Sequence, residues 1–204
     1  NLRRLSDAFD EVVMITGNHD LYYREKREIH SVPMVDRYPN LRMINDGIYE
    51  EDGCAFVPWL VEDEWKKLKD LKSRFVFGHF ELPSFYMNAM VQMPDYGHGL
   101  KAEHLNKAEK VFSGHFHKRQ EQGNIIYPGN CFPHNFSDAW DDDRGITFLK
   151  WDGTHEYMTW TDAPKYRTIP LSKLIDRPEE ILSNNTYCRI TLDVPISYEE
   201  ANFI

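Results

Sequence analysis

The sequence lacks several features, and each absence excludes a class of protein. No apolar run approaches the about 18 residues that a membrane-spanning helix needs, so we expect no contact with a membrane. The first residues, Asn1-Leu2-Arg3-Arg4, contain no apolar segment of the kind that directs secretion. The three cysteines lie far apart and form no CxxC pair, which predicts reduced thiols in a cytoplasmic protein.

Positive charge is also scarce, because 24 Lys and Arg face 33 Asp and Glu and leave a net charge of −9. Phosphate contacts need basic side chains, so this balance argues against a tight stand-alone DNA binder. A bound metal ion brings its own positive charge to a phosphate, so a phosphate substrate is not excluded. The 41% of hydrophobic residues can form a core, and the 204 residues suggest one domain plus the start of another.

Short apolar runs alternate with helical patterns in the first half of the chain and with hairpin patterns in the second. The expected strands are 12–16, 41–44, 54–57, 74–77, 111–113, 124–127, 145–151, 156–160, 166–169 and 187–194, and the expected helices are 1–10, 24–38, 62–72, 101–107 and 172–182. This layout predicts an α/β fold, a two-sheet sandwich flanked by helices. We expect the last thirty or so residues to belong to a second unit.

Three of the expected strands end in a glycine followed by polar side chains. The segments are Gly17-Asn18-His19-Asp20, Gly78-His79 and Gly114-His115-Phe116-His117. Loops at the carboxyl ends of strands converge on one crevice of an α/β sheet, and glycine lets the backbone turn sharply there. Imidazole nitrogens and amide oxygens suit Mn, Fe and Zn. A lone buried histidine is more often a core residue, but the three segments together predict a metal site.

In this order the three segments resemble the third, fourth and fifth motifs of the calcineurin-like metallophosphoesterases. The stretches around them resemble SbcD-type DNA-repair nucleases, particularly the phage recombination-endonuclease subunit, from about residue 10 to about residue 170; these stretches are 16–23, 57–59, 77–82, 112–117 and 127–129. The resemblance implies the metallophosphoesterase fold, with a nuclease domain over residues 1–170. Residues 171–204 would form a linker and the beginning of a small α+β capping domain.

The resemblance implies a role for each motif residue. Asn18, His79 and His115 would ligate one metal ion, and His117 would ligate a second. The metal is Mn²⁺ in most nucleases of this kind, and two such ions activate water and bind the phosphate. The remaining motif residues would be catalytic. His19 would protonate the leaving oxygen, and Asp20 would orient the His19 ring.

Other polar and aromatic residues are weaker candidates. Tyr22 and Tyr23 lie near a strand end and could stack on bases, although packing within the loop explains them equally well. His134 follows a Tyr-Pro-Gly stretch and is expected to contact substrate. The acidic run Asp138 and Asp141–Asp143 is expected to be a solvated loop.

The chain also departs from the family pattern. The first two motifs, Asp-x-His and Gly-Asp-x-x-Asp, supply most of one metal position in the family, and neither occurs before residue 17. We therefore interpret the chain as N-terminally truncated. It is expected to hold only one of the two metal ions and to be weakly active or inactive.

The preferred hypothesis is a nuclease subunit that hydrolyses DNA phosphodiesters in double-strand-break repair and recombination. The resemblance implies an SMC-like ATPase as its partner, allows a homodimer, and fits the cytoplasm of a bacterial or phage-infected cell. One alternative is a metallophosphoesterase acting on nucleotides, phosphoproteins or cyclic phosphodiesters. Another is a non-catalytic interaction fragment, although His19 would have no use in a purely structural site.

Overall fold

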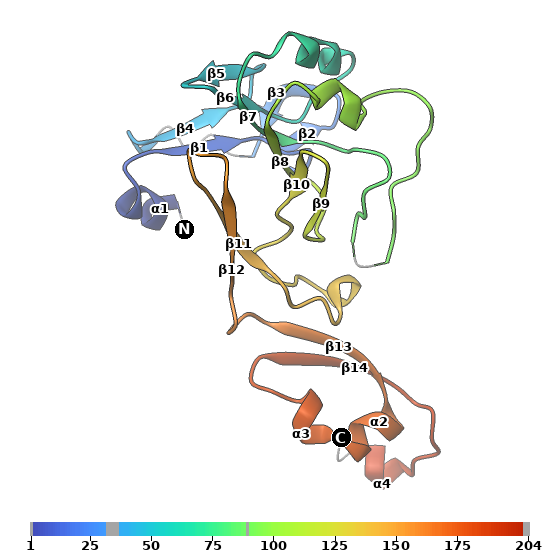
Figure 1. Ribbon diagram of the computed structural model, residues 1–204. Helices are drawn as coiled ribbons and strands as arrows, with labels where there is room; N and C mark the ends of the chain where they lie inside the picture. The colour runs from blue at the N-terminus through green and yellow to red at the C-terminus, as the bar shows by residue number, and fades with distance from the viewer. Residues whose placement is uncertain (1, 32–36, 89, 202–204) are drawn as a thin grey trace.

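The computed structural model describes residues 2–31, 37–88 and 90–201 of the chain. Its centre is a six-stranded sheet with the order β5-β6-β7-β8-β10-β9 (Figure 1). The strands are β5 (Tyr49–Glu51), β6 (Cys54–Val57), β7 (Phe75–His79), β8 (Lys110–Gly114), β9 (Gln120–Gln122) and β10 (Ile125–Tyr127). The four central strands run parallel, and a hairpin closes each edge. The carboxyl ends of β6, β7 and β8 therefore lie at one edge.

A separate parallel pair, β1 (Val12–Ile15) and β4 (Leu41–Ile44), lies beside this sheet. The backbone N–H of Trp59, just beyond β6, donates to the carbonyl of Thr16, just beyond β1, at 2.8 Å. This hydrogen bond brings the end of β1 to the same edge as the ends of β6 and β7.

The expected helix over residues 24–38 is wrong in its described part. Lys26–His30 is strand β3, which forms a hairpin with β2 (Leu21–Tyr23), while residues 32–36 lie outside the described part of the chain. The guanidinium of Arg27 donates to the carbonyl of Asn45 at 2.8 Å and pairs with Glu64. These tertiary contacts hold the segment extended and override its local helix propensity.

Helices are few and short. The expected helices at 62–72 and 101–107 are 3₁₀ segments, η2 (Glu64–Asp70) and η3 (Ala102–Leu105), which bury Leu68 and Leu105. A single α-helix, α1 (Leu2–Ala8), precedes β1. No helix within the described residues is long and apolar enough to cross a bilayer.

From residue 165 onward the chain extends away from the central sheet (Figure 1). The hairpin β11 (Gly145–Leu149) and β12 (His155–Thr159) follows the 3₁₀ turn η4 (Phe136–Asp138). A parallel pair, β13 (Lys165–Pro170) and β14 (Thr186–Thr191), then forms the far end of the molecule with α2 (Leu171–Asp176), α3 (Pro178–Ile181) and α4 (Tyr198–Ala201). Strand β13 precedes the expected domain boundary at residue 170, and its partner β14 follows it. The boundary itself stays a prediction.

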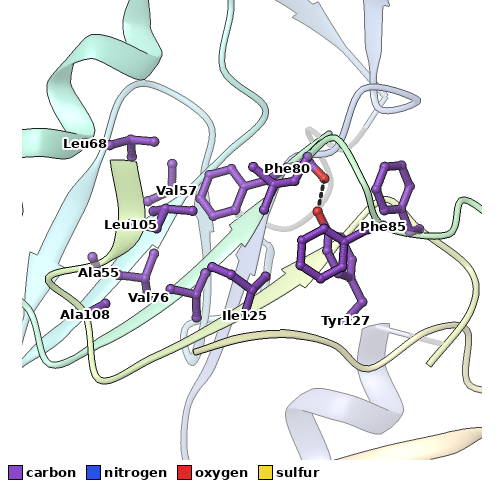
Figure 2. Close-up of a cluster of buried hydrophobic side chains, with 13 residues drawn as sticks. Ala55, Val57, Leu68, Val76, Phe80, Phe85, Leu105, Ala108, Ile125 and Tyr127 are labelled. Carbon is purple, nitrogen blue, oxygen red and sulfur yellow. Dashed lines mark hydrogen bonds between the residues drawn. The ribbon is translucent and has the colours of Figure 1, made fainter. Parts of the chain in front are cut away.

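The main core lies against the central sheet, next to the carboxyl ends of its strands (Figure 2). Val76 of β7 and Ile125 of β10, the strands on either side of β8, pack there with Phe80, which follows β7 directly. The buried hydroxyl of Tyr127 donates to the carbonyl of Phe80 at 2.9 Å. The chain is thus fixed immediately after His79. The α/β class is confirmed, whereas the described strands form one six-stranded sheet and four two-stranded pairs; the two-sheet sandwich stays a prediction.

Candidate metal centre

Three of the expected metal ligands meet at the strand ends. Asn18 follows β1, His79 is the last residue of β7, and His115 follows β8. Asn18 Oδ1 lies 3.0 Å from His79 Nε2 and 3.2 Å from His115 Nδ1. The two imidazole nitrogens are 3.3 Å apart. We call these three residues the ligand triangle.

Glycines make this close approach possible. A Cβ atom on Gly17 would lie 2.7 Å from Cε1 of His79, and one on Gly114 would lie 2.8 Å from its Nδ1. The His79 ring is therefore held between two glycine backbones. His115 itself adopts a left-handed backbone with φ of +88°, a strain of about 1–3 kcal/mol that persists only where the surrounding structure imposes it.

The triangle fits a single divalent ion. Protein nitrogen and oxygen ligands bind such ions at about 2.0–2.2 Å, so two ligands at right angles lie roughly 3 Å apart. Burial, followed by the nearby His115 and His19, lowers the pKa of His79 to about 3, which keeps its ring neutral and able to bind a metal. Among the described residues, no three His, Cys, Asp or Glu side chains gather to hold a metal, and here the third donor is an amide.

Residues that the sequence analysis did not single out support the triangle. Glu81 lies 3.4 Å from Nε2 of His115 and accepts from Arg24 at 3.0 Å. A proton shared between Nε2 and Glu81 leaves the Nδ1 lone pair of His115 facing the triangle. The His115 hydrogen bond is also the main cause of the lowered pKa of Glu81. Glu81 stands two positions after His79, a spacing that puts side chains on one face of an extended chain.

Trp59 forms a wall of the same site. Its ring centroid lies 5.3 Å from that of His115 and 5.9 Å from that of His79. The indole N–H donates to the carbonyl of Arg24 at 3.1 Å, and the Arg24 guanidinium lies 5.0 Å from the ring centroid. The tryptophan is buried and shields one side of the triangle from water.

His117 lies outside the triangle. Its backbone N–H donates to Met87 at 2.9 Å, and its carbonyl accepts from Asn130 at 3.0 Å. The nearest partner of its ring is His134, with 5.8 Å between centroids, and we call these two residues the second histidine pair. Burial is the main cause that lowers the pKa of His117, and the nearby Asp138 opposes it.

The expected solvated loop at 138–143 is wrong for Asp138, which is buried, while the other three carboxylates are partly or largely exposed. Asp138 and Arg144 are both fully buried and form an ion pair at 3.3 Å. Asp138 also accepts from the backbone N–H of His134 at 3.0 Å. Asp141 and Asp142 pair with Arg144 and Arg167, whereas Asp143 stays exposed. These carboxylates balance the charges of Arg144 and Arg167, which are buried in the folded chain and need a partner of opposite charge.

The expected catalytic and substrate-binding residues lie outside the ligand triangle, and most of them are exposed. His19 is exposed, close enough to His79 to affect its charge. Asp20 accepts from the backbone N–H of Gly17 at 2.8 Å, and within the described residues no hydrogen bond joins it to His19. Tyr22 and Tyr23 are exposed on β2 with their ring centroids 4.7 Å apart in an edge-on contact. Their roles, and that of the exposed His134, stay predictions.

Comparison with known proteins gives one informative similarity. No family model matches the chain. "Exonuclease subunit 1" of Enterobacteria phage T4 is 30% identical over 153 residues, which is 71% of this chain and 44% of the relative. The chain therefore spans less than half the length of this relative. The similarity relates the chain to a phage nuclease subunit.

Proposed function

We propose that the chain is part of a DNA nuclease subunit of the calcineurin-like metallophosphoesterase type. The observation that carries the proposal is the ligand triangle, three metal-binding atoms within 3.3 Å of one another at the ends of three strands. The similarity to a phage exonuclease subunit supports the choice of a nuclease over other phosphoesterases.

In this proposal the triangle holds one divalent ion, most simply Mn²⁺, through Asn18, His79 and His115. Held there by these three residues, a divalent ion would supply Lewis acidity toward the phosphate and toward a water nucleophile. His19 stands exposed beside His79, where it can donate a proton to the leaving oxygen. Asp20 holds the backbone turn that carries Asn18 and His19.

His117 is proposed to contribute one ligand to a second metal position, which the described residues alone do not complete. Tyr22 and Tyr23, exposed on β2, would contact the DNA strand. The phage relative is a subunit by its name, so we further propose a protein partner, an SMC-like ATPase, with a homodimer as the other arrangement that the resemblance allows. Residues 171–204 would begin the capping domain.

Binding of Mn²⁺ tests the proposal directly. Isothermal titration should give one manganese site in the wild-type chain. His79→Ala should weaken that site more than about 100-fold, because losing even an outer-shell partner costs 10–100-fold. His117→Ala should change the affinity less than about threefold, since its ring lies outside the triangle.

His155→Ala is the matched control, because His155 binds Glu121 at 3.0 Å on the opposite part of the sheet. A wild-type chain without manganese binding, or a His79→Ala variant that binds normally, would overturn the metal site. The substrate is tested separately from the metal site. A metallophosphoesterase with another substrate would bind manganese equally well, but it would hydrolyse small phosphodiesters and leave linear duplex DNA intact.

A further inference from the structure

A cavity of about 290 Å³ adjoins the ligand triangle. His79, Trp59 and Glu81 form its inner wall and are also part of the site described above. The outer wall comes from the segment between β7 and η3, including Met93 and Tyr96. Small-molecule sites are typically about 300–1,000 Å³, so this cavity has room for one small ring system.

The lining of the cavity combines aromatic and apolar side chains with two histidines and two carboxylates, His79, His98, Glu81 and Asp95. Trp59 and Trp65 are ordered walls: the first is buried against the triangle, and the second packs on the main core. Tyr96 stands at the rim with 68% of its surface exposed. Faces of this kind stack on flat rings.

No lysine or arginine is among the described residues that line the cavity, so it offers a phosphate no strong cationic partner. Its two carboxylates, Glu81 and Asp95, are already engaged by basic groups, and His98 stands beside Asp95. Glu81 contacts Arg24 and His115, and Asp95 accepts from the N–H of Gly97 at 2.7 Å and from Lys101 at 3.2 Å. The cavity therefore suits a flat, uncharged ring, while a phosphate is better placed at the triangle.

We propose that this cavity binds one unpaired nucleobase, and that the phosphate of the same nucleotide lies at the ligand triangle. This rests on the proposed function and specifies its substrate, a single-stranded or frayed end of DNA. His79 belongs to both places, so a base and its own phosphate are neighbours there. A base within a duplex cannot enter without first leaving its stack, so an already unpaired end is preferred.

Tryptophan indole signals in NMR report on the cavity without any metal. The chain has five tryptophans, and in ¹⁵N-labelled protein with EDTA we expect dTMP to shift the indole signals of Trp59 and Trp65 saturably. Trp140 and Trp151, exposed and remote from the cavity, are internal controls and should not shift. 2-Deoxyribose 5-phosphate, which lacks the base, should leave all five signals in place.

Two substitutions sharpen the test. Trp65→Leu and Tyr96→Leu should each raise the Kd for dTMP roughly tenfold, the loss typical of removing one aromatic that stacks on a base. Tyr187→Leu is the matched control, an exposed tyrosine that stacks on Tyr166 far from the cavity, and it should have no effect. Tyr96 is at the rim, so its variant stays informative if the Trp65 variant fails to fold.

Equal shifts from the base-free sugar phosphate, or an unchanged Kd in Tyr96→Leu, would overturn the base site. Saturable shifts with a tryptophan-containing peptide but not with dTMP would overturn it too, and would assign the cavity to a protein partner. Because EDTA is present throughout, these outcomes do not depend on manganese. A failed manganese titration with an intact dTMP response would reject the proposed function and keep the cavity as a base site.

Discussion

The ligand triangle and the second histidine pair differ in what holds them. The triangle residues stand at the carboxyl ends of strands, and His79 is enclosed by two glycine backbones. Their donor atoms come within 3.0–3.3 Å of one another. The ring centroids of His117 and His134 are 5.8 Å apart, against 5.2 Å for His79 and His115, and among the described residues no hydrogen bond joins the rings of the second histidine pair. The glycine backbones around His79 thus let donor atoms approach closely enough to prepare a metal position, whereas the rings of the second histidine pair come only into contact.

The carboxylate near the second histidine pair has a different task. Asp138 could serve as a metal ligand by type, yet it is fully buried against Arg144. An ion pair of this kind is costly to break, because the remaining charge has no water around it. The comparison thus separates a region prepared for a ligand from a region in which the charges are used to hold the fold.

Among the substitutions considered, Asp138→Ala should have the largest effect on stability, and it tests whether the charges near the second histidine pair hold the fold. It removes the fully buried carboxylate that pairs with Arg144 and leaves the partly exposed Asp141 to balance that charge, with Nη1 of the guanidinium already without a hydrogen-bond partner among the described residues. We expect the free energy of unfolding to fall by about 3–5 kcal/mol. Urea unfolding followed by circular dichroism measures it.

Asp63→Ala is the control, because Asp63 and its partner Lys66 are 74% and 56% exposed and their pair is a surface contact. Its cost should stay below about 1 kcal/mol. If Asp138→Ala proved as mild as the control and instead weakened manganese binding, Asp138 would be a ligand and the two regions would be alike.

Gly17→Ala tests the triangle from the backbone side. The added methyl would lie 2.7 Å from the His79 ring, so the ring must move or the backbone must shift. We expect a loss of about 1–3 kcal/mol in stability from the overpacking. Manganese affinity should fall in parallel, because the displaced Nε2 no longer completes the triangle.

Gly123→Asn is the matched substitution, since Gly123 has open space around its Cβ position and a φ of +61° that asparagine tolerates. It should alter neither property. A Gly17→Ala variant with normal stability and normal manganese affinity would show that the His79 ring is not held by its glycine neighbours.

Local patterns are enough to predict several of the short strands. Leu41–Ile44 and Cys54–Val57 form strands with the expected bounds, because each is a short apolar run ended by polar or turn residues. Residues 24–31 were mistaken for helix because the Arg, Glu and Lys side chains there favour a helix locally. Only the folded chain supplies Glu64 and the Asn45 carbonyl as partners for Arg27.

The site divides in the same way. Asn18, His79 and His115 were predictable because a glycine directly precedes each ligand segment at a strand end. The burial of Arg144 was not, since it depends on how residues 130–170 fold back on themselves rather than on any local pattern. The cavity beside the triangle is equally out of reach, because Trp59 and Trp65 meet β7 and the segment after it only in the folded chain.

Glu81→Gln should have the smallest effect, and it tests how much the Glu81 carboxylate contributes to metal binding by the triangle. The amide keeps the size of the side chain but removes the negative charge that contacts His115 Nε2 at 3.4 Å and Arg24 at 3.0 Å. Partners of this kind orient a ligating imidazole and raise its basicity, so we expect about tenfold weaker manganese binding. Stability should change little, because Glu81 is partly exposed. Titration with manganese measures the change, and Glu121→Gln, which alters the histidine–carboxylate contact of His155 instead, is the control. If the manganese affinity of Glu81→Gln were unchanged, the backbone positions and the glycines alone would prepare the triangle. The triangle and the second histidine pair would then differ even more in what holds them.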